Sequence, residues 1–174
     1  GNIVPELAVG FNDFGGTGAF SSEYIVASKR VKNLDLTLGL GWGRLGGRGH
    51  ISNPLGWLSD SYKNRGEGTR LGGTFNLGRL LTGENASFFG GFEYYTPIPN
   101  LSVKLEYDPT DYSDVIGRET VFDETGDIFE LDSRFNIGLN YQLDISQRDK
   151  IDFSLGFVRG NTLYANIAVH TNLN

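Results

Sequence analysis

The sequence contains no cysteine among its 174 residues. A disulfide framework and a thiolate metal site are therefore both excluded. It also lacks any uninterrupted apolar run of about 18 residues, so it encodes no transmembrane helix. That absence leaves a membrane β-barrel open, because barrel strands are marked only by a weak alternation. The formal net charge is −6, and the sequence shows no basic patch that could neutralise nucleic-acid phosphates. We therefore predict no nucleic-acid partner.

Methionine is absent as well, and the chain begins Gly1-Asn2 without a positively charged, apolar leader. We therefore expect either a processed protein or a fragment of a longer one. The length suffices for one domain with a full core, and we predict a single domain over residues 1–174. The 25 glycines and the 13% of aromatic residues are typical of a β protein rich in turns.

The clearest periodicity lies in residues 33–43. The large apolar residues occupy every second position: Leu34, Leu36, Leu38, Leu40 and Trp42. A period of two predicts a β-strand with one apolar face. Gly39, Gly41 and Gly43 lie on the other face, which indicates that something presses closely against it. The lumen of a narrow barrel is such a place.

The same alternation recurs along the chain and predicts eight strands without a helix. They cover residues 4–12, 21–31, 33–43, 88–94, 101–108, 134–143, 151–157 and 162–170. The connections over 45–85 and 109–133 are long, whereas the others are short. Short turns on one side and long loops on the other are typical of outer-membrane barrels. We therefore predict an all-β fold: an antiparallel, up-and-down transmembrane β-barrel of eight strands with two long extracellular loops.

One segment complicates this count. Leu71, Gly73, Phe75 and Leu77 alternate inside the first long connection. A structureless loop of that length is uncommon in a compact domain. We interpret residues 71–79 as a strand extension or an extracellular hairpin. As a wall strand the segment would make the number nine, and an even barrel would then need a partner strand from elsewhere.

Alternation alone does not say which face points outward. A soluble, lipocalin-like carrier would place the apolar face inside and the polar face in water. Glycines on the polar face serve little purpose in water, but they fit a crowded lumen. Aromatic residues also lie near the ends of several apolar rows, as in interfacial girdles: Phe11, Trp42, Tyr94, Tyr107 and Phe157. We favour the membrane barrel and keep the soluble barrel as an alternative.

Seven charged side chains fall on the predicted lumen face: Glu6, Asp35, Glu93, Lys104, Glu106, Arg134 and Asp152. They suit either a functional site, as a charged conduit or a proton-transfer site, or a structural network of paired charges. Eight strands leave no aqueous channel, so we predict the paired network and poor conductance in planar bilayers.

His50 and His170 are the only histidines of the chain. Some eight-stranded outer-membrane barrels are lipid-modifying enzymes with a His/Ser pair, in which the histidine activates the serine. Here the two histidines are expected at opposite ends of the barrel, and neither lies in a nucleophile motif. We predict a non-enzymatic protein without a cofactor, and a lipid A-modifying enzyme is the alternative.

The second long loop is acidic. Asp123, Glu124 and Asp127 are weak candidates for binding Ca²⁺, because carboxylates are the ligands that calcium prefers. The spacing is not that of an EF-hand, and a solvated charged loop accounts for the same residues.

The first long loop is basic and aromatic by contrast. Its candidates for contact with polysaccharide or lipopolysaccharide are Arg44, Arg48, Trp57, Tyr62, Lys63, Arg65 and Arg70. Aromatic faces stack on sugars, and cationic donors pair with acidic sugars or lipid phosphates. Anchoring at a membrane interface explains these residues equally well.

Several sequence blocks carry a family resemblance. They are Phe14-Gly15-Gly16-Thr17-Gly18, residues 21–30 and 39–46, Asn53-Pro54-Leu55, and residues 89–94, 104–108 and 159–162. Together they resemble the YjbH/GfcD family of outer-membrane exopolysaccharide (capsule) biosynthesis proteins. The resemblance implies a Gram-negative outer-membrane β-barrel that acts in secretion or assembly of an extracellular polysaccharide, with no catalytic residues to assign.

The resemblance also implies the partners. These are outer-membrane lipid and lipopolysaccharide, with the polysaccharide and other export-machinery proteins as candidates. Members of the family are considerably longer, so this chain resembles one barrel domain of such a protein.

Overall fold

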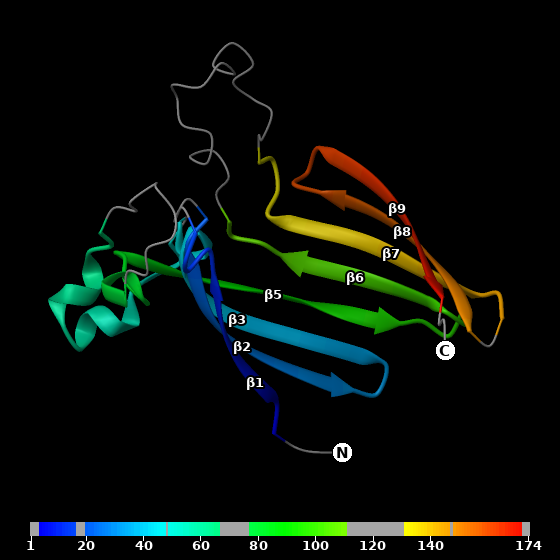
Figure 1. Ribbon diagram of the computed structural model, residues 1–174, viewed down its shortest axis with the longest axis horizontal. Helices are drawn as coiled ribbons and strands as arrows, with labels where there is room; N and C mark the ends of the chain where they lie inside the picture. The colour runs from blue at the N-terminus through cyan, green and yellow to red at the C-terminus, as the bar shows by residue number, and fades with distance from the viewer. Residues whose placement is uncertain are drawn as a thin grey trace, which may run out of the picture. The chain divides into compact units, whose positions relative to one another are not determined.

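The computed structural model describes residues 4–16, 20–47, 49–66, 77–110, 131–146 and 148–171 (Figure 1). Within these ranges the strands are β1 Glu6–Asn12, β2 Ser22–Val31, β3 Leu34–Gly43, β4 Ile51–Ser52, β5 Asn85–Tyr95, β6 Leu101–Tyr107, β7 Phe135–Asp144, β8 Asp149–Val158 and β9 Thr162–Thr171. The same ranges contain short 3-10 helices: η1 Arg44–Gly46, η2 Pro54–Trp57, η3 Asp60–Lys63 and η4 Leu77–Arg79. None of the helices within these ranges has the length and the hydropathy of a membrane-spanning helix.

The strands pair in the order β1-β2-β3-β5-β6-β7-β8-β9, and β4 pairs with β5 beside this path. The pairs β1–β2, β4–β5, β5–β6, β6–β7, β7–β8 and β8–β9 are all antiparallel. The eight strands on the path coincide with the eight predicted from alternation, so the all-β antiparallel fold is confirmed. Strand β4 was not predicted, because two residues are too few to show a period of two.

The closed barrel is not what the structure shows. Among the described residues no ladder joins β1 to β9, so the sheet forms an open series of strands. Alternation reports which residues share a face of a strand. Closure depends instead on strand tilt and stagger, which the pattern of a single strand does not record. The transmembrane barrel therefore stays a prediction.

The segment predicted to extend or add a strand within the first long loop lies mostly outside the described residues. Its described end, Leu77–Arg79, forms the 3-10 helix η4 rather than a strand.

The chain forms two compact units. The first comprises Gly1–Ser28, Leu38–Phe89 and Pro109–Phe129, and the second comprises Lys29–Thr37, Gly90–Asp108 and Glu130–Asn174. Strands β2, β3 and β5 contribute residues to both units. The single domain over residues 1–174 remains a prediction.

In the second unit the apolar face of the sheet is the exposed face. Along β7, Ile137 and Leu139 are exposed, whereas Gly138 and Asn140 between them are half-buried. The register extends this face across strands by pairing Leu139 with Leu155 of β8. The exposed row of β7 consists of Phe135, Ile137, Leu139, Tyr141 and Leu143. An antiparallel sheet of a soluble protein shows the opposite pattern, with its apolar face packed on a core.

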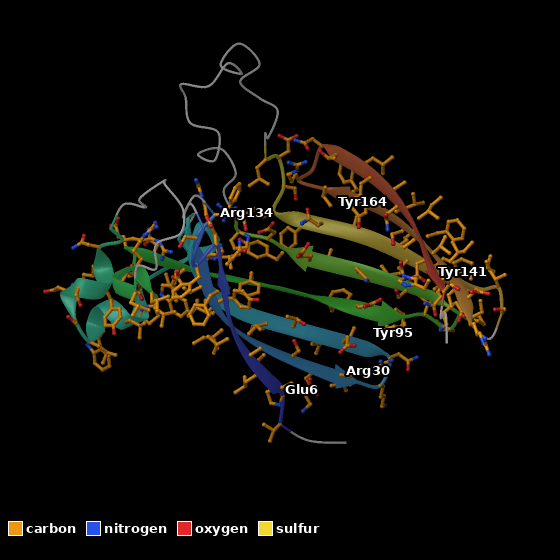
Figure 2. The ribbon with its side chains drawn as sticks, viewed as in Figure 1. Glu6, Arg30, Tyr95, Arg134, Tyr141 and Tyr164 are labelled. Carbon is orange, nitrogen blue, oxygen red and sulfur yellow. The ribbon has the colours of Figure 1, made fainter. Side chains whose placement is uncertain are left out.

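Glycines of the polar face lie in close contact with other side chains, and at two of them that side chain is an aromatic ring. A Cβ at Gly39 in the first unit would overlap the Phe89 ring. In the second unit a Cβ at Gly156 would overlap the ring of Tyr164, one of the side chains labelled in Figure 2. The close contact expected against these glycines is therefore confirmed.

Candidate functional site

Asn53 organises the long loop between β3 and β5 in the first unit. Its side chain is buried, with 5% of the residue exposed, and it caps the short helix η2. The Oδ1 atom accepts hydrogen bonds from Leu55 N at 3.0 Å and from Trp42 Nε1 at 2.8 Å. An asparagine before a proline at the first helical position is a favourable helix start, because Pro54 has no N–H to satisfy there.

The amide nitrogen of Asn53 ties the loop together. Nδ2 donates to the carbonyl oxygens of Tyr62 at 2.9 Å, Leu81 at 2.9 Å and Gly83 at 3.0 Å. One buried amide thus joins η2, η3 and the segment that leads into β5. A loop built in this way holds its surface residues in defined positions.

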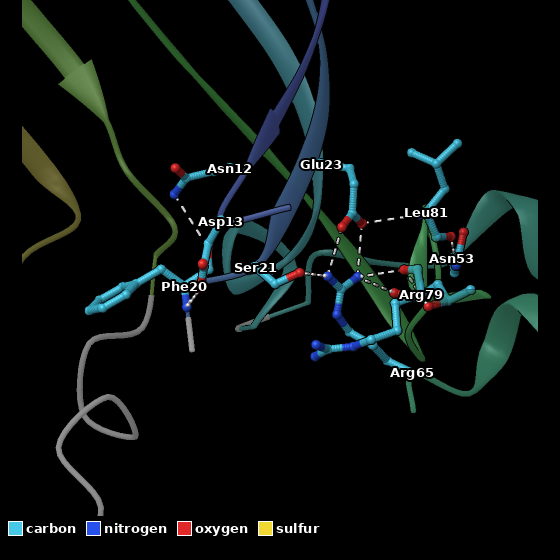
Figure 3. Close-up of polar contacts among 10 residues, drawn as sticks. Asn12, Asp13, Phe20, Ser21, Glu23, Asn53, Arg65, Arg79 and Leu81 are labelled. Carbon is cyan, nitrogen blue, oxygen red and sulfur yellow. Dashed lines mark hydrogen bonds and ion pairs between the residues drawn. The ribbon is translucent and has the colours of Figure 1, made fainter. Parts of the chain in front are cut away.

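A buried ion pair closes the same loop onto β2 (Figure 3). Arg65 donates to both oxygens of the Glu23 carboxylate, from Nη2 at 2.7 Å and from Nη1 at 2.8 Å. Only 14% of the Arg65 side chain and 3% of the Glu23 side chain are exposed. Such a bidentate pair is directional, so it fixes the position of the chain at Arg65.

Further hydrogen bonds provide partners for the other donors of Arg65 and the other acceptor positions of Glu23. Arg65 also donates to Ser21 Oγ at 2.6 Å and to the carbonyl oxygens of Arg79 and Thr82 at 3.0 and 3.1 Å. The backbone N–H of Leu81 donates to Glu23 at 3.0 Å. Full satisfaction matters, because a buried charge with an unmet partner is strongly destabilising.

Arg79 lies beside this pair. Burial lowers the pKa of its guanidinium, the charge of Arg65 lowers it further, and Glu23 and Asp13 act in the opposite direction. The group remains a cation at neutral pH, since an arginine titrates far above that range.

Trp57 is the most exposed large hydrophobic residue in the described part of this loop. It ends η2 with 92% of its surface exposed, and Leu58 beyond it is 71% exposed. Lys63 pairs with Asp60 at 2.5 Å within η3. A hydrogen bond to Lys63 lowers the pKa of the Asp60 carboxyl, and the lysine charge adds to this effect. The described part of the loop therefore exposes one large aromatic side chain on η2 and one ion pair on η3.

The predicted polysaccharide contacts are distributed unevenly. Trp57 and Lys63 are exposed, whereas Tyr62 and Arg44 are half-buried. The guanidinium of Arg65 is engaged by Glu23, so it holds the loop rather than facing solvent. Arg48 and Arg70 lie outside the described residues. Which of these residues contact a polysaccharide stays a prediction.

The structure pairs two of the predicted lumen charges with each other in the second unit, and a third accepts a hydrogen bond from a neutral side chain. Lys104 lies 3.6 Å from Glu93 across the β5–β6 ladder, and Ser102 Oγ donates to Glu93 at 2.6 Å. Asn136 Nδ2 donates to Glu106 at 3.2 Å.

The other four predicted lumen charges differ in their neighbours and in their exposure. Asp152 accepts from Gln142 at 2.9 Å and lies 2.9 Å from His170 Nε2. Arg134, labelled in Figure 2, donates to Tyr107 Oη at 3.2 Å. Glu6 is exposed near the start of β1, and Asp35 is half-buried on β3.

The two histidines have separate hydrogen-bonding partners. His50 Nδ1 accepts from Phe88 N at 3.2 Å in the first unit, and His170 lies beside Asp152 in the second. In the described part of the chain no group of three histidine or carboxylate side chains is arranged to hold a metal ion. The calcium candidates Asp123, Glu124 and Asp127 lie outside that part.

Sequence reasoning missed the two residues that hold the loop. The Asn53-Pro54 pair was a usable signal, because it matches a capped helix start. Glu23 carries no such signal, since its partner Arg65 lies 42 positions away in the sequence.

Comparison with known proteins places the chain in a family. The family model YjbH, described as "Exopolysaccharide biosynthesis protein YbjH", matches residues 1–174. The chain belongs to the YjbH family. It is 40% identical over 172 residues to the "Uncharacterized lipoprotein YjbH" of Escherichia coli (strain K12). That match covers 98% of this chain and 22% of the relative, so the chain spans about a fifth of the relative's length. No solved structure matches the chain.

Proposed function

We propose that this chain forms part of the wall of an outer-membrane β-barrel that supports exopolysaccharide biosynthesis or export without catalysing a reaction. The observation that carries the proposal is the exposure of the apolar face in the second unit. Alternate residues of β7 and β8 turn large apolar side chains outward, while the intervening polar and glycine positions are more enclosed. Lipid is the solvent in which that arrangement is favourable.

The free energies favour this environment. Full burial of a leucine, isoleucine or phenylalanine side chain is worth about 1.5–3 kcal/mol relative to water. β7 alone leaves Phe135, Ile137, Leu139, Tyr141 and Leu143 substantially exposed. In water this contribution would be largely lost, whereas contact with acyl chains recovers it.

Aromatic residues lie at both ends of the β6–β7 pair. Tyr107 and Phe135 pack at 5.1 Å between ring centroids at one end, and Tyr141 lies opposite Leu101 at the other. Outer-membrane barrels carry girdles of aromatic residues at both interfaces, so this placement supports the proposal.

The link to polysaccharide comes from the family. Its description names exopolysaccharide biosynthesis, and the E. coli relative is called a lipoprotein, which is in keeping with the cell envelope. We accordingly propose outer-membrane lipid and lipopolysaccharide as contacts, and the polymer and other export-machinery proteins as partners.

Membrane fractionation of the native protein tests the proposal. We expect the protein in the outer-membrane fraction, resistant to high salt and carbonate, released only by detergent, and heat-modifiable in gel migration. A monodisperse protein in detergent-free buffer would instead support the soluble, lipocalin-like carrier. Release of acyl chains from radiolabelled lipid A would support the lipid A-modifying enzyme.

A further inference from the structure

Strand β9 is the last strand of the sheet in the second unit (Figure 1). It pairs with β8 on one side, and no described strand pairs with its other side. Alternate residues of an antiparallel strand direct their N–H and C=O groups to opposite sides. The outer side of β9 therefore presents a row of backbone donors and acceptors that have no ladder partner among the described residues.

Side-chain exposure differs between β9 and an inner strand of the same unit. On β7, which has a neighbour on each side, exposed and half-buried residues alternate from Phe135 to Leu143. On β9 the consecutive residues from Leu163 to Ile167 are all exposed, so both faces of this strand are open. A further strand on the outer side would partly cover these side chains, as β6 and β8 cover those of β7.

β9 also lacks the features by which natural edge strands avoid pairing. Such strands are short or bulged, or they carry proline or charged side chains, lysine above all. β9 has ten residues, and none of them is proline, lysine, arginine, aspartate or glutamate. Its register with β8 runs without a bulge from Asp149↔Thr171 to Val158↔Thr162. The sequence of β9 is therefore typical of an inner strand.

Tyr164 holds β9 in this register. Its ring lies over Gly156, its cross-strand partner on β8, where an added Cβ would overlap the ring. The Tyr164 hydroxyl oxygen lies 3.9 Å from the place that a Cβ would take at Gly138 on β7. The outer edge of β9 is thus preformed, which lowers the entropic cost of pairing with a further strand.

We propose that β9 pairs, in the whole protein, with a β-strand of the same polypeptide that lies outside residues 1–174. The inference rests on the proposed function, because an open sheet edge in lipid leaves backbone groups without either water or protein partners. A neighbouring strand supplies all of these partners at once. The proposal names the element that continues the wall beyond β9.

The length of the family's proteins favours this partner over two others. The matched part is 22% of the E. coli relative, so about four-fifths of that protein lies outside it. β1 is the other edge strand of the described sheet, but its seven residues would cover only part of the ten residues of β9. A second copy of the protein is the third candidate, and crosslinking distinguishes the three.

Photo-crosslinking of the whole protein in intact cells tests the pairing. The photoreactive residue p-benzoylphenylalanine replaces Asn166 on β9 or, as the matched control, Asn140 on β7. The two asparagines lie in one cross-strand row, each opposite Ser154 of β8. We expect position 140 to crosslink only to β6 and β8. We expect position 166 to crosslink to β8 and also, at the mass of a single polypeptide, to a peptide outside residues 1–174.

Three results would overturn the proposal. They are a crosslink from position 166 to β1, a crosslink that joins two copies of the protein, and no crosslink beyond β8 while position 140 reacts with its two neighbours. Outer-membrane fractionation of the same cells keeps this test separate from that of the membrane wall. The expected crosslink in a protein that does not fractionate with the outer membrane would support the strand pairing and reject the wall.

Discussion

The sheet of the second unit and the loop of the first unit reverse the usual relation between polarity and burial in different ways. The sheet exposes its apolar residues and encloses glycines, serines and asparagines. The loop buries a charged pair and an asparagine amide, each with a full set of hydrogen-bond partners. The difference indicates that the sheet depends on its surroundings for stability, whereas the loop is stabilised by polar contacts of its own.

Breaking the buried ion pair should have the largest effect. Arg65→Met leaves the Glu23 carboxylate buried without its partner and should destabilise the loop by about 4 kcal/mol. A urea titration that is monitored by limited proteolysis within residues 49–66 measures the change in loop stability. Lys63→Met is the matched control, because it removes a cation from an exposed pair in the same loop. Equal effects of the two substitutions would contradict the structural role of Arg65.

Removing the Asn53 side-chain amide should have the second-largest effect on stability. Asn53→Leu keeps a similar volume but leaves three carbonyl oxygens and the Trp42 N–H without their partner, at a cost of about 3 kcal/mol. A red shift of Trp42 fluorescence, read in a Trp57→Phe background, reports the opening of its site. The exposed Asn64 supplies the control Asn64→Leu. A stable protein with unshifted Trp42 emission would show that Asn53 does not hold the loop.

Charge on the exposed apolar face should matter less, and only in a bilayer. Leu139→Lys should lower stability in lipid vesicles by about 2 kcal/mol, because it places an ammonium group against acyl chains. Asn140→Lys, one position along and on the other face, should have a smaller effect. Unfolding of both variants in vesicles measures the difference. A larger loss for Asn140→Lys would reverse the assignment of faces.

The pH dependence of Asp60 should be the smallest effect. Its pKa in the folded protein lies below the ordinary value because of Lys63, so the pair stabilises η3 above about pH 4. This contribution is lost as the pH falls through the folded pKa. NMR titration of the Asp60 carboxyl should show the lowered pKa, and Lys63→Met should return it towards the ordinary value. An identical Asp60 pKa in both proteins would show that Lys63 does not pair with Asp60.

The fold and the loop differed in how far the sequence could predict them. Strands such as β3 and β7 were readable, because the alternation of Leu34 to Trp42 or Phe135 to Leu143 is a local property. The covered glycines were readable for the same reason, as at Gly39. The pairing between Glu23 and Arg65 could not be predicted from the sequence. The two residues are 42 positions apart, and only the folded chain brings them together. Arg65 accordingly looked like a surface cation.

Accessibility of spin labels to oxygen and to a water-soluble nickel complex shows whether the apolar face of β7 meets lipid. The chain has no cysteine, so Leu139→Cys and Asn140→Cys can each carry one nitroxide on opposite faces of β7. In outer-membrane lipid we predict frequent collisions with oxygen and few with nickel at position 139, and fewer collisions with oxygen at position 140. A label at position 139 that collides with nickel as often as with oxygen would place the apolar face in water and rule out a lipid-facing wall.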